Sequence, residues 1–150
     1  MIRSKISDDM VNICLRQMGA SSIKTSPAHV NIAKFEIGDD LRITYMYEVK
    51  EEDIYLQRIS PYPMMIGKIY NEQQVVDIIT MDLKKFQAAY CSSNFSKFVD
   101  LANSVVTFNK EIENLFIAHN VTGESLDQIG EAIEELHQLI RDVSEKSPQL

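Results

Sequence analysis

Glu134 and His137 are the two side chains in this sequence whose types and spacing come nearest to a metal site. They stand three residues apart on a predicted helix, which is the spacing with which one helix of a di-iron bundle supplies two ligands. Such a centre needs a second Glu–His pair, and His119 has a phenylalanine three residues before it, where the pattern requires a glutamate. The sequence therefore predicts an exposed histidine among carboxylates, with no bound metal.

Nucleophilic or cofactor chemistry has no firm signature either. Ser21 and Lys24 have the spacing of a serine–lysine pair, but a chain this rich in serine contains such pairs by chance. The 5 glycines are scattered and form no phosphate-binding cluster. Cys14 and Cys91 stand far apart, and their apolar neighbours predict two reduced, partly buried thiols. No cofactor is expected, and these patterns favour a non-catalytic protein over an enzyme.

Tyrosines and methionines are concentrated in one stretch, with five of the 6 tyrosines between residues 45 and 70. Tyrosine buries its ring while keeping a hydroxyl for a polar partner, and methionine adapts to irregular surfaces. The mixture suits a ligand pocket or peptide groove, although a sheet that packs its aromatic face under helices is the commoner cause. The candidate ligand or partner surface consists of Tyr45, Tyr47, Tyr62, Met64 and Met65.

A narrow apolar seam near the C-terminus is the second candidate surface. Its residues step along the chain by 3, 4, 3, 4 and 3, which places them in one stripe on a helix. Such a stripe fits an intramolecular groove or a two-fold dimer, and we expect the dimer. Acids on both copies predict that the helices cross at an angle or are bridged by Arg141 and Lys146. The seam consists of Leu126, Ile129, Ile133, Leu136, Ile140 and Val143.

The net charge of −7 is concentrated in the C-terminal part of the chain. Nine acids and three bases lie from Lys110 to Lys146, so this region carries a net charge of −6. Docking on phosphate backbones depends on Lys and Arg, so no nucleic-acid partner is expected. The acids indicate a solvated helix face or a surface for a basic partner.

The elements that must position these residues follow from periodicity. Apolar spacing between Ser7 and Gly19 predicts an N-terminal helix, and alternation predicts a three-stranded antiparallel meander within residues 28–60. Residues 64–70 remain an apolar connector, and three helices follow within residues 71–146. The third of the four helices, over residues 95–119, has poor helix formers near its middle, so a hairpin around Asn103 is the alternative. The prediction is one α+β domain over residues 1–150.

The N-terminal sequence places acids where a signal peptide has its apolar core, and no apolar run approaches the ~20 residues that span a bilayer. A cytoplasmic location without membrane contact is expected. The sequence thus predicts a non-catalytic protein-interaction or regulatory module, homodimeric, with an acidic C-terminal helix. The alternative is a domain that binds an apolar small molecule in a Tyr- and Met-lined pocket between sheet and helices.

Overall fold

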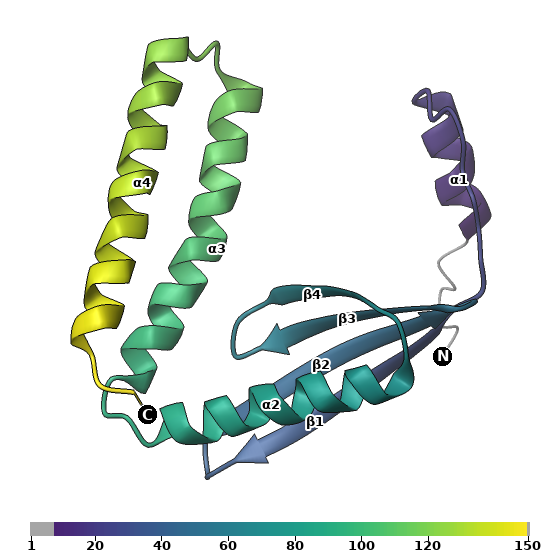
Figure 1. The fold of residues 1–150 in the computed structure, drawn as a ribbon. Helices are drawn as coiled ribbons and strands as arrows, with labels where there is room; N and C mark the ends of the chain where they lie inside the picture. The colour runs from purple at the N-terminus through teal and green to yellow at the C-terminus, as the bar shows by residue number, and fades with distance from the viewer. Residues whose placement is uncertain (1–7, 150) are drawn as a thin grey trace.

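A four-stranded antiparallel sheet lies at the centre of the computed structural model, which describes residues 8–149 (Figure 1). The strands pair in sequence order, so the sheet is a simple meander with β1 and β4 at its edges. The bounds are β1 His29–Ile37, β2 Leu41–Lys50, β3 Asp53–Ser60 and β4 Met64–Ile69. The α+β class is confirmed for this part of the chain.

The predicted number of strands was wrong, because the apolar connector forms β4. Pro61 and Pro63 lack amide donors and end β3, and the chain then reverses to pair with it. The register of β4 shifts between Leu56 and Gln57 of β3, opposite Gly67. This irregularity removes the strict alternation that marks a strand in a sequence, so the short element gave no period-2 signal.

Four helices are described, and three of them follow the sheet. Asn71 begins the second helix by accepting a hydrogen bond from the Gln74 amide at 2.9 Å, and Thr122 caps the fourth helix through the Ser125 amide at 3.2 Å. Ser7, from which the N-terminal helix was predicted to follow, lies outside the described residues. The bounds are α1 Asp8–Gln17, α2 Glu72–Tyr90, α3 Phe95–Ala118 and α4 Gly123–Lys146.

Helix α3 is continuous, so the alternative of a hairpin around Asn103 is excluded. Its polar side chains bond back to the helix: the Ser104 hydroxyl donates to the Asp100 carbonyl at 3.0 Å and the Thr107 hydroxyl to the Asn103 carbonyl at 3.3 Å. These local bonds occupy hydroxyls that would otherwise compete with the helix backbone.

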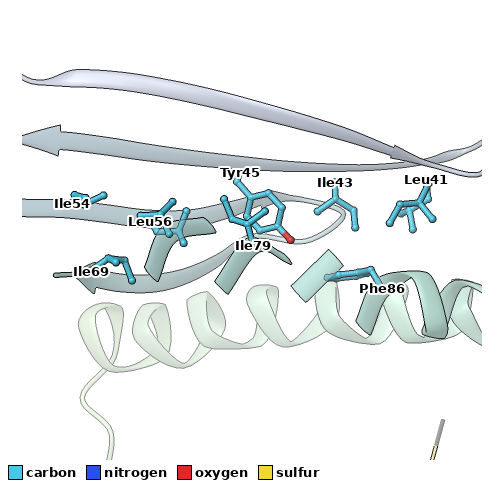
Figure 2. Packing of buried hydrophobic residues seen from close by; sticks show 10 residues of the cluster. Leu41, Ile43, Tyr45, Ile54, Leu56, Ile69, Ile79 and Phe86 are labelled. Carbon is cyan, nitrogen blue, oxygen red and sulfur yellow. The ribbon is translucent and has the colours of Figure 1, made fainter. Parts of the chain in front are cut away.

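The core lies between one face of the sheet and α2 (Figure 2). Alternation along β2 sends Ile43 and Tyr45 to this face, and both are fully buried. At the far end of α2, the Tyr90 hydroxyl donates to Asp40, and the Tyr90 ring packs on the β1–β2 turn. That turn needs Gly38, since its φ is +62° and an added Cβ would lie 2.6 Å from the Tyr90 ring. The buried cluster consists of Ile37, Leu41, Ile43, Tyr45, Ile54, Leu56, Ile69, Val75, Ile79 and Phe86.

Two parts of the fold extend away from this core (Figure 1). Helices α3 and α4 form an antiparallel hairpin that stands up from the C-terminal end of α2, and α1 stands at the opposite end of the sheet. Within α3 and α4, all of whose residues are described, no side chain is buried. The hairpin therefore leaves apolar side chains in contact with solvent.

Cys14 and Cys91 are both free and exposed, so the expectation of partly buried thiols was wrong. The apolar stripe of α1 is exposed to solvent, with Met10 69% and Ile13 57% exposed. Among the helices of residues 8–149, none has the length and apolar character needed to cross a membrane.

Candidate interaction surfaces

A buried polar cluster joins α2 to the sheet. Arg58 lies on the core face of β3 and is 3% exposed, and its Nη1 donates to Asp82 Oδ2 of α2 at 2.6 Å. The Tyr45 hydroxyl donates to the same carboxylate oxygen at 2.6 Å. Burial, followed by the Asp82 carboxylate, raises the pKa of Tyr45 above its ordinary value, so the hydroxyl remains a donor at alkaline pH where an exposed tyrosine would ionise.

Aromatic rings enclose the Arg58 guanidinium. Its central carbon is 4.4 Å from the centre of the Tyr62 ring and 4.8 Å from that of Phe86. Tyr62 in turn packs edge-on against Phe98 of α3, with ring centres 5.6 Å apart. Since cations are stabilised over ring faces, this arrangement fixes the start of α3 and the middle of α2 to the β3–β4 turn.

The five residues of the predicted Tyr and Met surface do not lie together. Tyr45 is fully buried, and Tyr47 is half-buried beside α2. Tyr62 and Met64 lie next to α3, on the same side of the sheet as Arg58. Met65 pairs with Gln57, so it lies on the opposite, uncovered face of the sheet, where it is 72% exposed. The five residues of the predicted Tyr and Met surface are therefore divided among the core, two grooves and the open face of the sheet.

The first groove, named here the sheet–helix groove, runs between the β1–β2 side of the sheet and α2. It has a volume of about 400 Å³ and an almost entirely apolar lining. A single helix is too narrow to cover four strands, so this strip of the sheet face is left open. Its lining residues include Phe35, Tyr47, Val49, Val76 and Leu83.

The second groove, named here the corner groove, lies where the β3–β4 turn meets the base of α3. Its volume is about 550 Å³. Its lining is mostly apolar, and Lys110 stands at its upper rim. A smaller hollow that shares Tyr62 and Phe98 adjoins it and carries Lys85. The lining consists of Tyr62, Pro63, Met64, Phe98, Ala102, Val105, Val106, Asn109 and Lys110.

The predicted seam lies on α4 and is unequally covered along its length. In the upper part, near the α3–α4 turn, Ile129 and Ile133 are half-buried. In the lower part, which we name the lower seam, Leu136 is 53%, Ile140 64% and Val143 53% exposed. Helix α3 alone therefore covers only the upper part of the seam.

The acids of α4 lie outside the seam and outside the positions that directly flank it. If the seam residues are positions a and d of a heptad that starts at Leu126, all seven acids of the helix fall at positions b, c or f. The flanking e and g positions carry no acid, so two seams can approach without the like-charge repulsion expected from the sequence. These flanking residues of α4 are Gly123, Ser125, Gly130, Ala132, His137, Leu139, Ser144 and Lys146.

Metal-ligating side chains do not gather in the part of the chain that the structure describes. No group of three or more His, Cys, Asp or Glu side chains there could hold a metal ion. Comparisons with protein-family models, with curated proteins and with solved structures found no match to this chain. The surfaces described above are thus the basis for inferring its function.

Arg58 and Asp82 are the important residues that the sequence reasoning missed, although both left a signal. Arg58 continues the alternation Ile54, Leu56, Arg58, so it places a charge on the face that is otherwise apolar. Asp82 stands between Ile79 and Phe86 in the apolar stripe of α2. Opposite charges in the apolar faces of two elements indicate a buried pair, since an unpaired charge there would be costly.

Proposed function

We propose that this protein is a non-catalytic intracellular interaction module that self-associates as a homodimer through the seam of α4. The observation that carries the proposal is the lower seam, whose three apolar side chains are each more than half exposed at regular helical spacing. Solvent exposure of a continuous apolar stripe is unfavourable by about 25 cal/mol per Å², so covering it favours association.

The residues around the seam favour a second copy of this chain as the partner. The hairpin has apolar side chains on both helices, with Leu101 65% and Phe116 62% exposed on α3. Helical hairpins with such faces commonly pair into four-helix bundles. Because C2 dimers are the commonest oligomers, and the acids of α4 lie outside the seam, a second copy is the simplest cover.

The test replaces Leu136 and Ile140 together with glutamate. Both side chains are exposed in the single chain, so we expect L136E/I140E to stay folded by circular dichroism and to become monomeric in light scattering. The matched control, Q128E/Q138E, makes the same change in net charge outside the seam of α4 and should remain dimeric. A wild-type monomer at all attainable concentrations, or a dimeric L136E/I140E, contradicts the proposal.

A second candidate function is binding of an apolar small molecule, and the sheet–helix groove supports it. Its volume of about 400 Å³ lies in the range typical of ligand sites, although Tyr47 is its one contribution from the predicted Tyr and Met surface. If the sheet–helix groove binds a small molecule, native mass spectrometry of the purified protein should detect a bound ligand of defined mass. Val76→Trp would fill the groove and remove that ligand, whereas the exposed Met81→Trp on the same helix should not. A ligand that stays bound to the Val76→Trp variant excludes this groove as its site.

A further inference from the structure

We propose that the corner groove of one copy holds the lower seam of α4 from a second copy, so that two α3–α4 hairpins form a four-helix bundle. The inference rests on the self-association proposed above and names the surface that the seam contacts. It brings together two surfaces that the single chain leaves uncovered, the seam on α4 and the groove between α3 and the β3–β4 turn.

The first argument is that the two surfaces match in chemistry. The corner groove is apolar and open, with Phe98 43% and Val105 59% exposed on α3 and Met64 49% exposed at the start of β4. The lower seam offers aliphatic side chains at helical spacing. Methionine and phenylalanine adapt to such side chains, and burial of both surfaces removes two apolar patches from water.

The second argument is charge. Exposed Lys110 stands at the upper rim of the corner groove, and exposed Lys85 stands in the hollow that continues it below. On α4, Glu135 and Asp142 occupy position c, which is next to the edge of the lower seam. They are seven residues apart, about 10 Å along the helix, and thus form an acidic pair beside the apolar stripe. A basic rim around the groove complements this acidic edge.

The third argument is geometric. No α4 residue lines the corner groove, so the groove uses a side of α3 that its own α4 does not cover. Each helix of a four-helix bundle contacts two neighbours, and the groove provides α3 with its second contact. The lower end of α4 and the base of α3 lie at the same end of the hairpin (Figure 1). A two-fold axis parallel to the hairpins therefore places the partner's lower seam level with the groove.

In this arrangement the partner's α4 runs antiparallel to α3. Glu135 then lies toward the Lys110 end of the groove, and Asp142 lies toward the Lys85 end. The symmetry makes the interface isologous, because each copy donates one lower seam and one corner groove.

A charge exchange between two variants tests this placement. Variant A is K85E/K110E, which makes the rim acidic, and variant B is E135K/D142K, which makes the seam edge basic. In a homodimer of A or of B, like charges face each other at both grooves. We expect each variant alone to have a dimer dissociation constant raised about tenfold or more, as measured by analytical ultracentrifugation.

Mixing A with B should restore dimerisation, because the acidic rim of A meets the basic edge of B and the native rim of B meets the native edge of A. The mixed dimer should have a dissociation constant close to that of the wild type. Wild-type affinity in A and B alone, or no recovery on mixing, overturns the placement. If the charge exchange fails but L136E/I140E still abolishes the dimer, the proposed homodimer stands and only the placement of the seam in the corner groove is wrong. A monomeric wild type contradicts both the homodimer and this placement.

A disulfide test distinguishes a second copy from the chain's own α4. Val105→Cys with Ile140→Cys, in a chain with Cys14→Ser and Cys91→Ser, should give a disulfide-linked dimer on a non-reducing gel. The control pair, Glu111→Cys with Ile140→Cys, places the first thiol on the polar side of α3 and should not link. A linked monomer from the first pair shows that α4 reaches the groove of its own chain, which overturns the proposal.

Discussion

At the scale of single residues, a charge pair joins α2 to the core face of the sheet. Arg58 is 3% exposed and Asp82 22%, so removing one partner leaves a poorly solvated charge behind. The Tyr45 hydroxyl and the rings of Tyr62 and Phe86 complete the surroundings of the pair. The cluster fixes α2 to the sheet and α3 to α2, and so determines where the hairpin stands.

Asp82→Asn should therefore destabilise the protein. The change keeps the size of the side chain and removes its charge, so we expect the free energy of unfolding in urea to fall by about 3 kcal/mol. This value is at the lower end of the range for buried pairs because Asp82 is partly exposed. Asp77→Asn, on the exposed side of the same helix, is the matched control and should have little effect. A cost for Asp82→Asn as small as that of the control would show that the pair does not anchor α2.

Replacing both charges is the complementary measurement. Arg58→Met with Asp82→Leu and Tyr45→Phe removes both charges and the hydroxyl that donates to Asp82, so the stability of this variant should recover toward that of the wild type. Equal destabilisation by the triple variant and by Asp82→Asn would assign the loss to packing in the cluster instead of to the uncompensated guanidinium.

At the scale of elements, the strongly periodic segments could be predicted and the irregular ones could not. Residues 71–90 and the seam have clear helical spacing, and in the structure Asn71 and Thr122 cap the two helices. Strand β4 has six residues and a register shift, so neither period appears in its sequence. Helix α3 was uncertain because its β-branched residues near Val105 are weak helix formers, yet the helix is continuous.

The candidate surfaces were less predictable than the elements. Clustering in the sequence suggested one Tyr and Met surface, but strand alternation and the β4 register send Met64 and Met65 to opposite faces of the sheet. The corner groove depends on a meeting of β4 and α3, which are far apart in the chain. No local pattern reports such a contact, because it is determined by the direction in which α3 leaves α2.

At the scale of the whole molecule, the burial of side chains is uneven. The core lies between the sheet and α2, whereas α3 and α4 together contain 48 residues, none of them buried. Isolated helices gain little stability in water without tertiary packing. A hairpin of this length would gain stability from cover by a second surface, which the homodimer proposed above would supply.

Hydrogen exchange at two protein concentrations tests this dependence. Amides in α3 and α4 should exchange faster in dilute protein, where the dimer dissociates, while amides of β2 and β3 keep the same protection at both concentrations. In the L136E/I140E variant, the hairpin should exchange fast even in concentrated solution, because the partner that protects it is absent. Hairpin protection that is strong in both dilute wild type and L136E/I140E would mean that the two helices are stabilised within one chain. The exposed seam would then be a surface for a different protein.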